Sequence, residues 1–182
     1  MAGLPIDHIG ILVPDLEEAI ARWSSATGYR FSPIARYRTN RYIDHSDATP
    51  HFHDTRISFS FESSPRIELL EVTGTGTHGP SELGVHHLGF MNVENPAGRM
   101  QELASFGIEE DGRVLDEADN VLLCFTERSA LDGVRLEFVS PLPAPTIADD
   151  GSALWRDPAT GRNSLWGPPP DVPAEAAVAE ER

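Results

Sequence analysis

Two histidines and two glutamates recur in the same order in the two halves of this sequence. They are His8 and Glu68 in the first half, then His87 and Glu137 in the second. Imidazole nitrogens and carboxylate oxygens are the ligands that proteins offer to divalent ions of borderline or hard character. The residue types therefore point to a metal centre, provided that the fold brings the four side chains together.

Each of the four residues lies in a short apolar stretch with strand-like alternation. Successive residues of a β-strand point to opposite faces. Ile9 and Ile11 then share one face and His8 lies on the other, and the other three residues follow the same pattern. A buried carboxylate is costly unless a cation or a hydrogen-bonding partner balances it. The alternation thus predicts one concave face that carries two imidazoles and two carboxylates as metal ligands.

The two histidine strands and the two glutamate strands make the chain a duplication. Residues 84–91 repeat in kind the stretch of residues 7–12, and each copy is followed downstream by a glutamate strand. The interval between histidine and glutamate is longer in the first half, which therefore carries an insertion. A repeat of this size determines the fold more strongly than local propensity does.

The four motifs resemble those of the vicinal oxygen chelate superfamily, which includes glyoxalase I, methylmalonyl-CoA epimerase, bleomycin resistance proteins and extradiol dioxygenases. The matching motifs are Asp7-His8-Ile9-Gly10, Ile67-Glu68-Leu69, His87-Leu88-Gly89 and Leu136-Glu137-Phe138. The resemblance implies an α+β fold of two tandem βαβββ modules, which form a cupped mixed sheet around a metal site. It covers residues 5–141, with module one at 5–73 and module two at 84–141.

The elements that position the motifs can be placed along the chain. Asp15 is expected to cap a helix that ends at Gly28, and Asn95 to cap a second helix that Gly107 closes. A strand is expected at residues 29–38. The segment 73–83, rich in glycine and threonine, is predicted to link the modules, with His78 exposed.

Residues 39–54 are predicted to form a long loop at the rim of the cup. The segment contains three histidines, and long loops over a site often act as lids or specificity elements. A solvated acidic loop is the alternative. The strand expected at residues 55–61 alternates apolar with polar residues, and its small polar side chains are expected to leave room in the cup. The expected substrate-binding residues are Arg56, Ser58, Ser60, His51 and Met91.

Composition after residue 141 shifts to proline, alanine and acidic residues. Trp155 and Trp166 are large aromatic side chains that are seldom left in water. Residues 142–167 are therefore expected to pack onto the domain as a C-terminal strap, followed by a mobile acidic tail at 168–182.

The whole-chain charge excludes several classes of partner. The 182 residues contain 14 basic residues against 29 acidic ones, for a net charge of −15. Nucleic acid and anionic membranes would be repelled, so neither is an expected partner. All the basic residues are arginine, which rules out a lysine Schiff base or a P-loop lysine.

The single cysteine and the apolar pattern set further bounds. Cys124 alone supports neither a disulfide framework nor a thiolate metal cluster. No stretch approaches the length of a membrane span, and the N-terminus lacks a signal pattern. A cytoplasmic location is expected, and the two modules are expected to form the cup within one chain or by exchange in a homodimer.

The ligand set suits Zn, Ni, Co, Mn or Fe(II), and the sequence does not choose among these divalent metals. Such an ion holds two neighbouring oxygens of a small-molecule substrate and stabilises the enediolate formed when an adjacent C–H loses its proton. The expected activity is that of an isomerase, epimerase or lyase.

The resemblance also implies which residues remove the proton. In glyoxalase I the base is a metal-bound glutamate, which corresponds to Glu137 or Glu68 here. The epimerase also uses a glutamate just before its third strand, where this chain reads His51-Phe52-His53-Asp54. A histidine or an aspartate of this stretch could substitute for it, and His53 is the candidate catalytic residue. This departure argues against methylmalonyl-CoA itself, as does the lack of an evident basic cluster for the CoA phosphates.

Three other functions fit the same resemblance. Bleomycin resistance proteins bind small molecules in this fold without a metal and need not keep four ligands. Extradiol dioxygenases bind Fe(II) with two histidines and one glutamate, an arrangement that Glu68 would obstruct. A cyclase or isomerase of secondary metabolism would use the same cup.

Overall fold

The computed structural model describes residues 3–63, 65–141 and 147–148. The expected strap at 142–167 and the tail at 168–182 lie outside the described residues, apart from a two-residue strand, β9 (Ile147–Ala148). That strand pairs antiparallel with residues 35 and 36.

Two runs of one strand, one helix and three strands follow each other along the chain. The first run is β1 (His8–Val13), α1 (Leu16–Thr27), β2 (Ala35–Asp44), β3 (Asp47–Phe59) and β4 (Arg66–Glu71). The second is β5 (Gly84–Phe90), α2 (Pro96–Ala104), β6 (Glu110–Leu115), β7 (Val121–Thr126) and β8 (Arg135–Val139). The α+β class with a repeated βαβββ order is confirmed.

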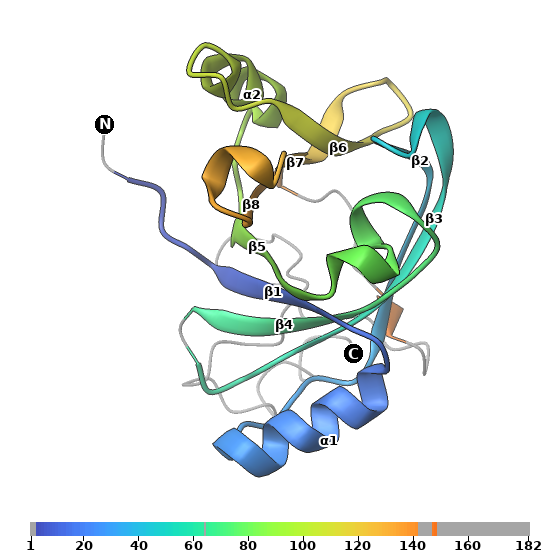
Figure 1. The fold of residues 1–182 in the computed structure, drawn as a ribbon, viewed down its shortest axis with the longest axis vertical. Coiled ribbons are helices and arrows are strands. Elements are labelled where there is room, and N and C mark those ends of the chain that lie inside the picture. Colours follow the sequence, from blue (N-terminus) through green and yellow to red (C-terminus); the bar gives the residue numbers. More distant parts are fainter. Residues whose placement is uncertain (1–2, 64, 142–146, 149–182) are drawn as a thin grey trace, which may run out of the picture.

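The strands form one mixed sheet that curves around a central cup (Figure 1). Their order is β3-β4-β1-β5-β8-β7-β6-β2-β9, and β2 also pairs with β3, which completes a circuit of eight strands. The pairs β1 with β4 and β5 with β8 are parallel. The antiparallel pair β1 with β5 joins the modules, so the two histidine strands lie side by side at the centre.

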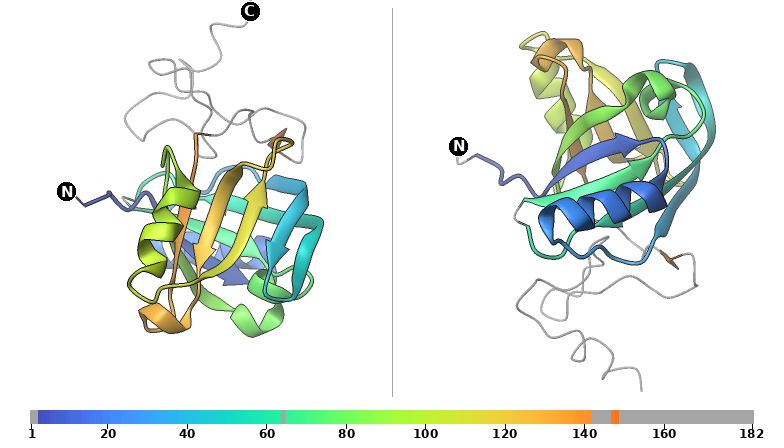
Figure 2. Two further views of the ribbon diagram at one scale, coloured as in Figure 1. Left: turned by 90° about the horizontal axis from the view of Figure 1, so that it is seen from above. Right: turned by 60° about the horizontal axis from the view of Figure 1, so that its bottom comes forward.

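The helix ends follow the expected capping chemistry. Asp15 accepts a hydrogen bond of 2.7 Å from the backbone N–H of Glu18, and Gly28 ends α1 in the left-handed conformation, at φ 77°. Asn95 caps α2 in the same way through the N–H of Gly98, at 2.9 Å. Figure 2 shows α1 lying against the outer face of β1 and β4, while α2 lies at the far side of the molecule.

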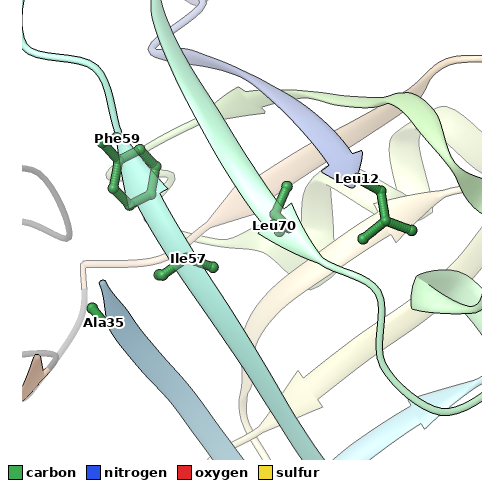
Figure 3. Close-up of a cluster of buried hydrophobic side chains, with 5 residues drawn as sticks. All are labelled: Leu12, Ala35, Ile57, Phe59 and Leu70. Atoms are coloured by element: carbon green, nitrogen blue, oxygen red, sulfur yellow. The ribbon is translucent and has the colours of Figure 1, made fainter. Parts of the chain in front are cut away.

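Strand alternation separates two kinds of core. On the outer face, Val13 and Leu69 pack against α1 through Leu16 and Ala19. On the inner face, another cluster is contributed by β1, β2, β3 and β4 (Figure 3). Its members are Leu12, Ala35, Ile57, Phe59 and Leu70. The inside of the cup is therefore largely apolar.

The expected orientation of β3 is wrong. Ile57 pairs with Leu70, and paired residues share a face, so Ile57 points into the cup. Arg56 points outward and contacts Glu17 of α1 and Glu71. The small polar residues of β3 lie on the outer face because Ile57 and Phe59 are buried on the inner face against Leu12 and Leu70.

The loop expected at residues 39–54 is instead a β2–β3 hairpin. Its turn lies at residues 45 and 46, and β2 begins at residue 35 rather than 29. The expected exposure of His78 is also wrong, because this residue ends a 3-10 turn (Gly76–His78) and is buried. No helix among the described residues is long and apolar enough to cross a membrane.

Candidate metal centre

The four sequence-predicted ligands meet at the centre of the cup. His8 and His87 extend from the adjacent strands β1 and β5, and Glu68 and Glu137 extend from the parallel partners β4 and β8. All four side chains are buried, with at most 6% of each residue exposed. The duplication thus brings residues from four strands to one point.

The distances between their donor atoms are short. His8 Nε2 lies 3.0 Å from His87 Nε2 and 3.0 Å from Glu137 Oε2. Glu68 Oε2 lies 3.0 Å from His87 Nε2 and 3.5 Å from His8 Nε2. His87 Nε2 is 3.6 Å from Glu137 Oε2. The two imidazoles and Glu137 alone make a group of three potential ligands.

This geometry fits a divalent cation. Ligand atoms about 2.1 Å from an ion lie about 3.0 Å apart at right angles and about 3.4 Å apart in a tetrahedron, close to the separations here. Glu68 Oε2 is buried and accepts no hydrogen bond, although it lies close to His87 Nε2. A buried carboxylate oxygen without a donor is costly, and a cation would satisfy it.

The pKa shifts of His8 and Glu137 also indicate that the site favours positive charge. Burial alone would lower the pKa of His8, but the carboxylate of Glu68 and the hydrogen bonds to Asp7 and Glu137 outweigh it and raise the pKa to about 10. Burial would raise the pKa of the Glu137 carboxyl, but the nearby imidazoles of His87 and His8 hold it below its usual value.

Two glycines make room for the imidazoles. Gly10 pairs with His87 across the sheet, and Gly89 pairs with His8. A Cβ atom at either glycine would overlap the ring of the histidine opposite. Both glycines lie within the sequence motifs, but strand alternation alone predicts no role for them. The available signal was the histidine-x-glycine spacing present in both copies.

A pocket adjoins the metal centre. Glu68 and Glu137 form part of its wall, so both carboxylates reach the histidines and the pocket together. The remaining lining residues are mainly aromatic and aliphatic: Tyr37, Tyr42, His53, Thr55, Ile57, Leu70, His78, Val114, Leu123, Phe125 and Val139. No arginine of the described residues lines it.

The structure distributes the other sequence-predicted site residues unevenly. His53 lines the pocket as expected, on β3. Arg56, Ser58 and Ser60 lie on the opposite face of the sheet, where Ser58 donates to the carbonyl of Ser32 at 2.7 Å and Ser60 bonds the N–H of Ile67 at 2.9 Å. The pocket lining does not include His51 or Met91.

Three further histidines gather beside the pocket, and we refer to His53, His78 and His86 as the neutral histidine cluster. The ring centre of His78 lies 4.7 Å from that of His53 and 4.8 Å from that of His86. The cluster meets hydroxyls and a carbonyl: His53 Nε2 lies 2.5 Å from Thr55 Oγ1, and His86 Nε2 lies 2.6 Å from the carbonyl oxygen of Thr77.

Burial dominates the titration of this cluster. It lowers the pKa of His53 to about 4, and it holds the pKa values of His78 and His86 well below the usual range for histidine. All three imidazoles are therefore uncharged at neutral pH. Strand alternation and spacing in the sequence do not predict that His78 lines the pocket or that the ring of His86 packs against it.

Several solved structures are similar to this chain, and the first of the following three supports the fold. A hypothetical protein from Bacillus halodurans C-125 matches with a TM-score of 0.51 and 20% identity, over 76% of this chain and 95% of the other. A methylmalonyl-CoA epimerase from Mycobacterium tuberculosis matches with a TM-score of 0.48 and 19% identity, over 79% and 94%. A variant of the Streptomyces coelicolor methylmalonyl-CoA epimerase, in complex with 2-nitronate-propionyl-CoA, matches with a TM-score of 0.47 and 18% identity, over 76% of this chain and 98% of the other.

No curated protein matches the sequence. The sequence profile of the Glyoxalase/Bleomycin resistance protein/Dioxygenase superfamily matches residues 7–108, which is more than half of the chain. That match spans β1, α1, β2, β3 and β4, then the strand of His87 and the helix after it. The chain belongs to the Glyoxalase/Bleomycin resistance protein/Dioxygenase superfamily, the vicinal oxygen chelate proteins.

Proposed function

We propose that the protein is a divalent-metal-dependent isomerase, epimerase or lyase, which removes a proton next to a carbonyl. The metal ligands would be His8, Glu68, His87 and Glu137. The observation that carries this proposal is the buried Oε2 atom of Glu68, which has no hydrogen-bond donor yet lies within 3.5 Å of both imidazole nitrogens. Such an arrangement is suited to a cation shared by the four side chains.

A bound divalent ion would supply Lewis acidity, holding two neighbouring substrate oxygens and making an adjacent C–H more acidic. The chain must supply the base. Glu68 and Glu137 both line the pocket, so a carboxylate oxygen of either can face a substrate held there. A general base must lie within hydrogen-bond reach of the proton it removes, and these two groups are the only carboxylates among the lining residues of the described pocket.

His53 is the second candidate for proton transfer. It lines the same pocket, and the pKa of about 4 that burial imposes keeps its imidazole neutral at pH 7. A neutral imidazole carries one donor and one acceptor nitrogen, so it can donate a hydrogen bond to a substrate oxygen from one nitrogen and accept a proton at the other. The hydrogen bond between Thr55 Oγ1 and His53 Nε2 holds the ring in place.

The pocket wall favours an uncharged substrate group. Its described lining is aromatic and aliphatic apart from the two metal-side glutamates, two histidines and a threonine. With no arginine in that lining and no lysine in the chain, a carboxylate or phosphate placed there would lack a cationic partner. We therefore expect a small molecule with vicinal oxygens at the metal end and an apolar body.

Deuterium exchange tests the proposed chemistry. Metal-loaded protein in deuterated water should exchange or isomerise at least one class in a panel of 2-oxoaldehyde–thiol adducts, 2-methyl-3-oxo thioesters and 2-hydroxy ketones. The variants Glu137→Gln and Glu68→Gln identify the base. The variant that keeps the metal but exchanges about 100-fold or more slowly is the one in which the base has been replaced. Oxygen uptake with catechols, or full exchange in both variants, would contradict the mechanism.

A further inference from the structure

Each candidate ligand histidine is preceded in the sequence by a residue that contacts its Nδ1 atom, the ring nitrogen that faces away from the other ligands. Asp7 Oδ1 lies 3.1 Å from His8 Nδ1, and His86 Nδ1 lies 2.8 Å from His87 Nδ1. We infer that Asp7 and His86 are positioning residues, which keep a hydrogen on Nδ1 of the next histidine and so leave its Nε2 lone pair directed at the metal centre. This inference rests on the proposed metal site.

The hydrogen positions around His86 follow from its partners. The carbonyl oxygen of Thr77 can only accept, so the contact of 2.6 Å requires a hydrogen on His86 Nε2. A second hydrogen on the ring would make a buried cation. The ring nitrogens contact only Thr77 and His87 among the described residues, so no carboxylate would balance such a cation.

His86 Nδ1 is therefore an acceptor. The contact of 2.8 Å with His87 then requires that His87 Nδ1 carries the hydrogen and donates it. With that hydrogen fixed on the outer nitrogen, His87 Nε2 is the nitrogen available to a metal. Its distances of 3.0 Å to both His8 Nε2 and Glu68 Oε2 place it at the centre of the ligand group. Partners of this kind orient metal-binding imidazoles and fix their tautomer.

Asp7 performs the same task for His8 with different chemistry. A carboxylate only accepts, so His8 Nδ1 donates to Asp7 Oδ1. The side chain of Asp7 is 33% exposed and charged, whereas His86 is buried. Loss of His86 would leave a buried N–H of His87 without an acceptor, whereas water can replace Asp7. We therefore expect His86 to be the more sensitive of the two positions.

Two variants of His86 separate positioning from mere space filling. His86→Leu removes both hydrogen bonds, whereas His86→Asn offers an amide donor to Thr77 and a carbonyl acceptor to His87. Long-range proton–nitrogen NMR of the metal-free protein shows which ring nitrogen of His87 carries hydrogen. Competition with a chelator gives the Kd for Zn²⁺ or Co²⁺, and far-ultraviolet circular dichroism checks folding.

We expect the hydrogen on His87 Nδ1 in the wild type and in His86→Asn, and its loss from Nδ1 in His86→Leu. Metal affinity should fall about 10- to 100-fold in His86→Leu and stay within about threefold in His86→Asn. A wild-type His87 without hydrogen on Nδ1 would overturn the inference, as would His86→Leu binding metal as tightly as the wild type. Because the NMR reading needs neither metal nor turnover, it stands or fails separately from the proposed function. If His86→Leu does not fold, the wild type and His86→Asn decide.

Discussion

The two groups of histidines in this cup differ in their partners and therefore in their charge. His8 faces the carboxylates of Glu68, Glu137 and Asp7, and its pKa rises to about 10. The neutral histidine cluster of His53, His78 and His86 meets hydroxyls, a carbonyl and other rings, and burial lowers its pKa values. Burial is similar in both groups, so the neighbouring carboxylates decide which imidazoles attract positive charge.

The carboxylates, rather than the imidazoles alone, distinguish the group that suits a cation. A site that already stabilises a proton with carboxylates also suits a metal ion, whereas burial disfavours a proton on the imidazoles of the neutral histidine cluster. The metal centre and the neutral histidine cluster meet at the contact of 2.8 Å between His87 and His86. Each prediction below changes one of the two groups and leaves the other in place.

Removal of a ligand histidine should have the largest effect. Structural metal sites bind with about 10–16 kcal/mol, or about 3 kcal/mol for each of four ligands, which corresponds to about 100-fold in Kd. His8→Ala and His87→Ala should each weaken Zn²⁺ or Co²⁺ binding by at least this factor. His53→Ala is the matched control and should retain the metal. Equal metal affinity in all three variants would remove the distinction between the two groups.

The glycines opposite the ligands should come next in effect. A methyl group at Gly89 or Gly10 overlaps the ring of His8 or His87, so Gly89→Ala and Gly10→Ala must displace an imidazole from the centre. We expect a loss of metal affinity of about 10- to 100-fold, as for other disturbances of ligand orientation. Gly3→Ala, where a Cβ meets nothing within 4 Å, serves as the control.

Competition with a chelator measures the metal affinity of all three glycine variants. Wild-type affinity in both Gly10→Ala and Gly89→Ala would show that the imidazoles do not need their present positions. An equal loss in Gly3→Ala would mean that the assay reports general damage rather than ligand displacement.

The neutral histidine cluster should make the folded protein less stable in acid. The pKa of His53 is about 4 in the folded chain against an ordinary 6.5, so the unfolded chain binds more protons below pH 6.5. The free energy of unfolding should therefore fall as the pH drops, by about 2 kcal/mol from His53 alone at pH 5. His78 and His86 contribute in the same direction.

Urea unfolding of metal-free protein at pH 7 and pH 5 measures this effect. His53→Gln should lose part of the pH dependence, whereas His51→Gln should keep it. His8 acts in the opposite sense, since its raised pKa contributes stability below pH 6.5 that is lost only as the pH rises through about 10. Stability that rises from pH 7 to pH 5 would contradict the assignment of the cluster as neutral.

Strand alternation made the convergence of the four side chains predictable from sequence. Ile67 and Leu69, on either side of Glu68, pack toward α1 together with Ile11 and Val13 of the His8 strand. The repeat of this pattern with His87 and Glu137 left one shared face. The capping residues Asp15 and Asn95 fixed the helix starts for the same local reason. Periodicity and capping depend on neighbours in sequence, which a sequence displays directly.

The pocket wall was not predictable in the same way. The face that Ile57 occupies depends on its pairing with Leu70 in another strand, and the burial of His78 depends on contacts with Tyr42 and Phe125. Residues 39–54 contain polar and aromatic residues that favour a loop locally, but pairing with β3 and β6 makes β2 a strand. Such long-range contacts override local preference.

Metal content tests the central claim most directly. Wild-type protein expressed with Zn, Ni, Co and Mn supplied, then dialysed and measured by elemental analysis, should contain about one divalent ion per chain, and His8→Ala and His87→Ala should contain almost none. Wild type that is as free of metal as both variants would contradict the account and favour a small-molecule binding protein in its place.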